Sequence, residues 1–207
     1  MSGEPALWAA AGFAALAFAL LSLFVRRAPL GIDRLPEARI GWWTGPAIAL
    51  TRSGYASAIA TISLIAAGVT LALHGRFAGL LAVVGAQVLS QAAVHAVKAT
   101  LRRPRPDDWL FRRERGRSFP SGHASTAVAF YGGWAWLVAV TGLPLGVRVC
   151  LAVALLLWAA GIMWSRVALR AHFPSDVLGG ALLGAAFLCA AHALPFTFDL
   201  DRAPLRG

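Results

Sequence analysis

The sequence predicts an all-α fold, a single domain over residues 1–207 built as a bundle of six transmembrane helices. Hydrophobic residues make up 58% of the chain and charged residues only 14%, whereas a soluble domain is about half apolar and about a quarter charged. The apolar residues also gather in long unbroken runs. Together, the composition and the clustering indicate a chain that lies in a lipid bilayer.

Six apolar runs approach the length needed to cross a bilayer. A helix needs about 20 apolar residues to span the roughly 30 Å hydrocarbon core. Only helices and closed barrels satisfy their backbone polar groups in lipid, and these runs lack the alternation of barrel strands. The predicted spans are residues 6–25, 56–73, 77–97, 122–140, 145–164 and 177–194.

The first run is predicted to be a retained span and not a signal peptide. No basic segment precedes it, no small-residue cleavage site follows it, and Arg26 and Arg27 come directly after it. The mixed stretch 26–55, where Trp42 and Trp43 are adjacent, fits two structures equally well. It forms either short amphipathic helices in the membrane interface or an ordinary loop.

Topology brings two reactive loops to the same side of the membrane. If six helices alternate in direction, the first, third and fifth loops share one side, and loops 98–121 and 165–174 carry the reactive side chains. A formal charge of +10 would suggest nucleic acid for a soluble protein. Here the basic residues lie between apolar runs, so we expect an active site at one membrane face and no nucleic acid.

Three cations and a turn could hold a phosphoryl group at this face. Lys98 closes the third predicted helix, Arg166 closes the fifth, and Arg105 lies in the loop between the third and the fourth. Arginine offers planar bidentate donors to phosphate oxygens, and lysine offers a mobile point charge. Ser121 and Gly122 lead into the fourth helix, whose first N–H groups favour an anion. Glycine there allows close backbone approach.

Two histidines could perform the chemistry. His172 and Asp176 are four residues apart, so on one helical turn the carboxylate could reach a ring nitrogen. That bond would fix the tautomer and leave the other nitrogen free to attack phosphorus. His123, from another helix, could protonate the departing oxygen and then activate water. This scheme requires no metal and no cofactor.

These residues closely resemble the motifs of the type 2 phosphatidic acid phosphatase family. The chain has Lys-x6-Arg-Pro from Lys98, Pro-Ser-Gly-His at 120–123, and Ser-Arg-x5-His-x3-Asp from Ser165, in the family's order. The resemblance implies that His172 forms a phosphohistidine, that Asp176 orients it and that His123 is acid and then base. The positions that it implies for phosphate binding are Lys98, Arg105, Ser121, Gly122 and Arg166.

The resemblance implies a lipid phosphatase, and the short chain rich in Ala, Arg and Gly favours a bacterial cytoplasmic (inner) membrane as its location. Undecaprenyl diphosphate is the favoured substrate, with phosphatidate and phosphatidylglycerol phosphate as the alternatives. Two other functions stay open: a non-hydrolytic protein that binds or transports a lipid phosphate, and a vanadate haloperoxidase-like activity. The substrate, the side of the membrane that the site faces and the oligomeric state are not determined by the sequence.

Other polar residues are expected to have structural roles. The polar strip of Gln87, Ser90 and Gln91 is expected to bond between helices, and Gly180 and Gly184 to allow close helix packing. His74, His95 and His192 are expected in turns or packing, and no role is assigned to Arg170. The remaining arginines of the third loop are expected to be solvated beside anionic lipids: Arg102, Arg103, Arg112, Arg113, Arg115 and Arg117.

Overall fold

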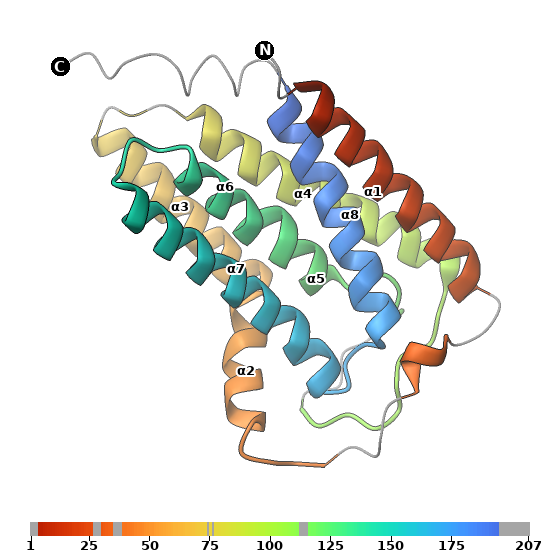
Figure 1. The fold of residues 1–207 in the computed structure, drawn as a ribbon. Helices are drawn as coiled ribbons and strands as arrows, with labels where there is room; N and C mark the ends of the chain where they lie inside the picture. Colours follow the sequence, from red (N-terminus) through yellow and green to blue (C-terminus); the bar gives the residue numbers. More distant parts are fainter. Residues whose placement is uncertain are drawn as a thin grey trace.

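The computed structural model describes residues 4–26, 30–34, 39–73, 75, 77–111 and 116–194. Within these ranges every regular element is helical and no strand occurs, which confirms the predicted all-α class (Figure 1). Two short elements, the 3-10 helix η1 (Gly31–Asp33) and the π-helical segment η2 (Ala127–Gly132), accompany the α-helices. These are α1 (Glu4–Val25), α2 (Thr44–Ser53), α3 (Ala56–Ala72), α4 (Ala78–Leu101), α5 (Gly122–Thr126), α6 (Gly133–Ala139), α7 (Leu145–Ala168) and α8 (Pro174–Ala193).

The number of spans differs from the prediction. Among the described residues, four helices are long and apolar enough to cross a membrane: α1, α4, α7 and α8. A fifth is reached if α2 and α3, bent by 54° at their junction, are counted as one span. The run predicted at 122–140 is divided into α5, η2 and α6, so the predicted count of six is not confirmed.

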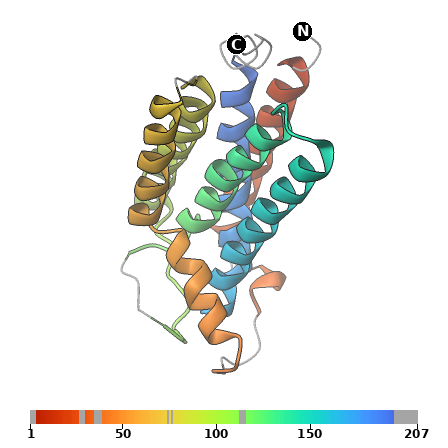
Figure 2. The ribbon, with the colours of Figure 1, turned by 90° about the vertical axis from the view of Figure 1, so that its left-hand side faces the viewer.

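The long helices run side by side, and α8 contacts α1, α4 and the α5–η2 segment (Figures 1 and 2). The described parts of the connections after α1, α4 and α7 lie at the lower end in Figure 1. Helix α2 projects from the bundle at this same end, as Figure 2 shows. The predicted meeting of the first, third and fifth loops is therefore confirmed.

Glycines of α8 let it pack directly against the start of α5. A Cβ atom built on Gly180 would lie 2.2 Å from the carbonyl oxygen of Ser121, and one on Gly184 would lie 2.6 Å from that of Ser125. Real Cβ atoms do not come this close to backbone atoms. The expected close helix packing is confirmed, and it fixes the Pro-Ser-Gly-His segment against α8.

The polar strip of α4 ties that helix to α5. The amide of Gln87 donates to Thr126 Oγ1 at 2.9 Å, and the amide of Gln91 donates to the Gly122 carbonyl at 3.1 Å. Ser90 instead bonds the Gln87 carbonyl within its own helix, at 3.0 Å. Bonding between helices is thus confirmed for both glutamines but not for Ser90.

Two further predictions concern packing and the first loop. The ring of His192 stacks on Trp136 with 5.2 Å between centroids, so its packing role is confirmed. The stretch 26–55 contains the helices η1 and α2, which favours the helical interpretation over an ordinary loop. His74, Arg112, Arg113 and Arg115 lie outside the described residues.

Candidate active site

A pocket of about 220 Å³ opens where the loops converge. Its wall includes Lys98 from the last turn of α4, Gly122 and His123 from α5, and His172 from the α7–α8 connection. Four predicted site residues, which are far apart in the sequence, therefore line one cavity. His95, expected to be a packing residue, also lines it, one turn before Lys98.

His172 is held in a tight turn that follows α7. The carbonyl of Arg166 accepts the backbone N–H groups of both Ala171, at 3.0 Å, and His172, at 3.1 Å. Arg170 makes the turn in the left-handed region at φ 57°. The His172 side chain is almost fully buried, and its Nε2 lies 3.0 Å from Nη1 of Arg105. Since arginine only donates, Nε2 is the acceptor and carries the lone pair.

Burial and neighbouring charge keep the His172 ring neutral. Burial is the first cause that holds the pKa of His172 well below its ordinary value of 6.5, and the cations Arg166, Arg105 and Lys98 act in the same direction. A backbone contact from Ser118 acts in the opposite direction. The imidazole is therefore in its neutral form at neutral pH, with one unprotonated ring nitrogen, as a nucleophile must have.

Asp176, in the first turn of α8, faces the other ring nitrogen. Its Oδ2 lies 3.5 Å from Nδ1 of His172, longer than an ordinary hydrogen bond. The same oxygen accepts the N–H of Phe173 at 2.9 Å and a short hydrogen bond from Ser118 Oγ. Oδ1 is 2.5 Å from Nη1 of Arg103. The carboxylate is thus fixed beside His172 by groups other than the histidine.

His123, in α5, also lines the pocket. Its ring lies edge-on to Tyr55, with 5.1 Å between centroids, and contacts the backbone of Thr51. Its Nε2 is buried, and no group among the described residues hydrogen-bonds to it. Gly54 lies directly against the ring, where a Cβ atom would come within 2.6 Å of Cδ2. The bend between α2 and α3 therefore forms the wall behind His123.

Arg166 completes the set of cations. It lies in the last turn of α7, is 1% exposed, and donates a short hydrogen bond from Nη1 to Oγ1 of Thr51. Arg105, on the facing loop, donates to the Ala171 carbonyl at 2.8 Å and lies over the ring of Trp109. Two guanidinium groups and one ammonium group thus surround the two histidines.

Comparison with known proteins matches this chain to a family. The model of the PAP2 superfamily matches residues 79–199, which include every predicted site residue. This match covers more than half of the chain. The chain belongs to the PAP2 superfamily.

Individual relatives agree with this assignment. Over 82 residues the chain is 35% identical to phosphatidylglycerophosphatase B of Escherichia coli strain K12, and equally to the proteins of that name from E. coli O157:H7 and Shigella flexneri. That match spans 39% of this chain and 30% of each relative. A crystal structure of a transmembrane PAP2-type phosphatidylglycerolphosphate phosphatase from Bacillus subtilis superposes over 100% of both chains, with a TM-score of 0.76 at 23% identity. The apolar helices and this shared fold make the chain an integral membrane protein.

Two predicted phosphate-binding positions of this PAP2 protein differ in their placement. Gly122 lines the pocket, and a Cβ atom there would lie 3.2 Å from Oε1 of Gln91. Ser121 is fully buried: its N–H donates to the Asp176 carbonyl at 2.9 Å, and its Oγ accepts the N–H of Ala124 at 3.4 Å. The structure therefore places Ser121 as a helix cap, and its contact with phosphate stays a prediction.

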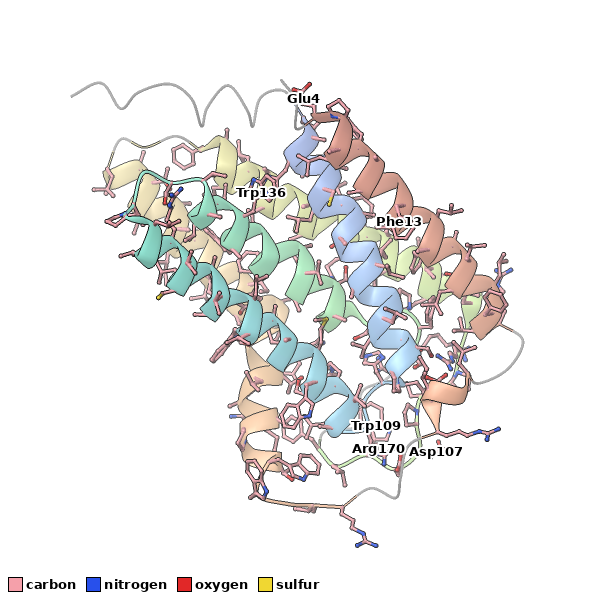
Figure 3. The ribbon with its side chains drawn as sticks, viewed as in Figure 1. Glu4, Phe13, Asp107, Trp109, Trp136 and Arg170 are labelled. Carbon is pink, nitrogen blue, oxygen red and sulfur yellow. The ribbon has the colours of Figure 1, made fainter. Side chains whose placement is uncertain are left out.

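One expectation for the third loop is wrong. Arg103 is not solvated but 8% exposed, since its guanidinium binds the carboxylates of Asp33 and Asp176. The extra charge at Arg170 lies 3.6 Å from Asp108, and Figure 3 shows its side chain at the loop end of the bundle near Trp109. An ion pair across two loops is its observed contact.

Several residues that contact the candidate site were not identified from the sequence. Thr51, Gly54 and Tyr55 contact Arg166 or His123, and Asp33 binds Arg103. All four precede the segment 79–199 that matches the family. The sequence signal that could have indicated them is their position in the first loop, which was predicted to lie on the same side of the membrane as the active site.

Proposed function

We propose that this PAP2 protein hydrolyses the phosphate or diphosphate group of a membrane lipid through a phosphohistidine at His172. The observation that carries the proposal is the pocket shared by His172, His123 and Lys98, in which the lone pair of Nε2 faces Arg105 at 3.0 Å. A neutral nucleophile, a proton donor and cations for the phosphoryl oxygens lie together there.

In the first step, Nε2 of His172 attacks phosphorus and the bond from phosphorus to the leaving oxygen breaks. Arg105 exchanges its contact with Nε2 for a phosphoryl oxygen, and Lys98 and Arg166 bind the remaining charge. His123 gives its proton to the leaving oxygen, so that the departing group leaves as a neutral alcohol or as a lipid monophosphate. Positioning and charge stabilisation supply the rate enhancement.

In the second step, water hydrolyses the phosphohistidine. Nε2 of His123, now unprotonated, takes a proton from the water while its oxygen attacks phosphorus. The N–P bond breaks, inorganic phosphate leaves, and His172 regains its lone pair. Asp176 keeps the proton of His172 on Nδ1 through both steps, which supports the choice of Nε2 as the nucleophile.

An apolar groove supports a lipid as the substrate. It measures about 450 Å³, lies between α3 and the η2–α6 rod, and is lined almost entirely by apolar groups. Ile59 and Thr126 line the catalytic pocket, while Ile62 and Phe130 line the groove one turn further along the same helices. A hydrocarbon chain in this groove would place its phosphate beside His172.

We further propose that α5, η2 and α6 together form the sixth span. Residues 122–139 follow one another as a single rod, and at 1.5 Å per residue the rod is about 27 Å long. This supports six crossings, with the site at one membrane face. A bacterial inner membrane is the proposed location, in keeping with the bacterial relatives.

Phosphatidylglycerol phosphate is the first substrate to test, because the names of the relatives specify it. Undecaprenyl diphosphate, the substrate favoured from the sequence, and phosphatidate belong in the same panel. Phosphate release from each lipid is measured for the purified protein in detergent, with and without a chelator. We expect release that persists with the chelator and is lost in His172→Ala.

Trapping distinguishes the mechanism from the alternatives. Brief reaction with a substrate labelled in the scissile phosphate should label the protein with an acid-labile, base-stable bond that His172→Ala cannot form. Vanadate should inhibit, since it mimics the transferred phosphoryl group. Lipid movement across vesicles without phosphate release would overturn the proposal in favour of transport, and a fully active His172→Ala would overturn the nucleophile.

A further inference from the structure

Asp33, in the short helix η1 after α1, is buried beside the active site. Its Oδ2 accepts the N–H of Leu30 at 3.0 Å, the hydroxyl of Ser175 at 2.8 Å and Nη2 of Arg103 at 2.7 Å. Its Oδ1 accepts the N–H of Ser175 at 3.0 Å. Four hydrogen bonds therefore tie this carboxylate to the start of α8, to the third loop and to its own turn.

Arg103 is shared between two carboxylates. While Nη2 binds Asp33, Nη1 binds Oδ1 of Asp176 at 2.5 Å and the hydroxyl of Ser175 at 2.7 Å. The guanidinium also lies over the ring of Phe173, 4.7 Å from its centroid. A buried charge is costly unless it is paired, and here one cation serves two buried anions.

This arrangement decides how Asp176 faces the nucleophile. Arg103 occupies Oδ1, so Oδ2 is the oxygen that is left for the hydroxyl of Ser118, the N–H of Phe173 and Nδ1 of His172. Rotation of the carboxylate would break the charged contact to Arg103. Both the orientation of Asp176 and its ionised state thus depend on a residue that does not line the pocket.

We infer that Arg103 and Asp33 are positioning residues for the His172 nucleophile and act on it through Asp176. Arg103 holds the carboxylate ionised and turned toward Nδ1. Asp33 takes up part of the guanidinium charge, so that Asp176 keeps enough negative charge to orient the imidazole. The inference rests on the proposed phosphohistidine chemistry and extends the machinery to the first loop, outside the family match at 79–199.

We call the chain of contacts from Asp33 through Arg103 to Asp176 the relay. Three variants test it: Arg103→Gln, Arg103→Lys and Asp33→Asn, with Arg102→Gln as the matched control. Arg102 is the adjacent, exposed arginine, and its side chain bonds only weakly to the Ala99 carbonyl, at 3.5 Å. Arg103→Gln should lower kcat about 10- to 100-fold, which is the cost of losing a hydrogen-bond partner that orients a metal-binding histidine in other enzymes. KM should change little, because the phosphate-binding cations are intact. Arg103→Lys should recover part of kcat, and Arg102→Gln should match the wild type.

The pH dependence gives a readout that simple structural damage would not produce. The charged groups around Asp176 are Arg103 and Asp33, and the titratable ring that it faces is that of His172. Without the Arg103 cation, the buried carboxylate of Asp176 takes up a proton more readily. Arg103→Gln should therefore move the acid limb of the pH profile of kcat to higher pH. Asp33→Asn leaves the whole guanidinium charge to Asp176 and should move that limb to lower pH. Shifts in the same direction would overturn the relay.

A double variant and a spectroscopic measurement complete the test. If Asp33 acts only through Arg103, adding Asp33→Asn to Arg103→Gln lowers kcat no further. The Nδ1 signal of His172 in ¹⁵N spectra of the protein in nanodiscs should shift in Arg103→Gln and stay unchanged in Arg102→Gln. A wild type that releases no phosphate would refute the proposed function while this shift still supported the relay. An unchanged signal and an unchanged kcat in Arg103→Gln would refute the relay alone.

Discussion

Gly54, at the bend between α2 and α3, is the site of the sharpest test of the catalytic geometry. Its φ of −87° is open to any L-residue, so alanine adds no backbone strain there. The added Cβ atom would lie 2.6 Å from Cδ2 of His123 and 3.3 Å from Cγ2 of Ile162. The main consequence of Gly54→Ala is therefore a collision with the imidazole of His123.

The size of the effect follows from this distance. Carbon atoms in contact are ordinarily about 3.5–4.0 Å apart, so the ring must move by about 1 Å. It can do so only by leaving the edge contact with Tyr55 or the backbone of Thr51. A misplacement of about 1 Å can cost about 100-fold in rate, equivalent to about 2.7 kcal/mol of activation free energy. Since the atoms nearest the added Cβ belong to His123 and Ile162 and not to the proposed phosphate-binding cations, the loss should fall on kcat and not on KM.

The assay compares Gly54→Ala with Gly68→Ala. Gly68 lies in α3, and a Cβ atom added there would meet no other atom within 4 Å, so alanine at this position should keep the wild-type kcat. Initial rates of phosphate release give kcat and KM, and thermal unfolding checks that both variants are folded. A Gly54→Ala protein with the kcat of Gly68→Ala would refute the placement of His123 against this bend, and with it the role of His123 in proton transfer.

Three further outcomes are expected. Gly180→Ala would place a Cβ atom 2.2 Å from the backbone carbonyl oxygen of Ser121, and it should reduce the free energy of unfolding, measured by thermal unfolding, by about 1–3 kcal/mol. Its control is Gly85→Ala, where the Cβ atom meets open space, and this variant should be neutral or slightly stabilising. Because burial lowers the pKa of His172, its ring should stay neutral as the pH falls through 6.5, and a ¹⁵N titration with its midpoint at or above 6.5 would contradict this. His123→Gln should lower turnover of a lipid phosphate by about 10²–10⁴-fold yet keep a stoichiometric burst of p-nitrophenol from p-nitrophenyl phosphate, whose leaving group needs no proton; loss of the burst would contradict the general-acid role.

The sequence predicted the parts of this protein that depend on local patterns. Apolar runs predicted the long helices, and the motif positions placed Lys98, His123 and His172 at or beside helix ends that meet at one pocket. The polar strip and the glycines of α8 were also predictable, because helical periodicity alone puts them on a contact face. The π-helical segment was not predictable, since nothing in the run 122–140 distinguishes it from a regular helix.

The missed residues depend on tertiary contacts. Arg103 stands among six arginines of similar context, and only the fold shows that it is buried between Asp33 and Asp176 while Arg102, next to it, is exposed. Thr51 follows the same logic, since a lone threonine in a mixed loop gives no sign that it binds Arg166. Ion pairs and pocket walls formed by residues far apart in the chain leave no periodic pattern in the sequence.

The candidate site therefore has two parts, one inside the segment that matches the family and one outside it. The proposed reacting groups His123, His172 and Asp176 lie within residues 79–199, and α8 packs closely on α5 there. Part of the pocket wall, from Gly54 to Ile59, lies outside that segment, and so does α3, which forms one side of the apolar groove. Helix α3 packs mainly on α2 and α4, and most of its apolar side chains remain exposed. Substitutions of the α3 residues that line the groove should thus alter which lipid binds, whereas substitutions of His123, His172 or Asp176 should alter whether the phosphate is transferred.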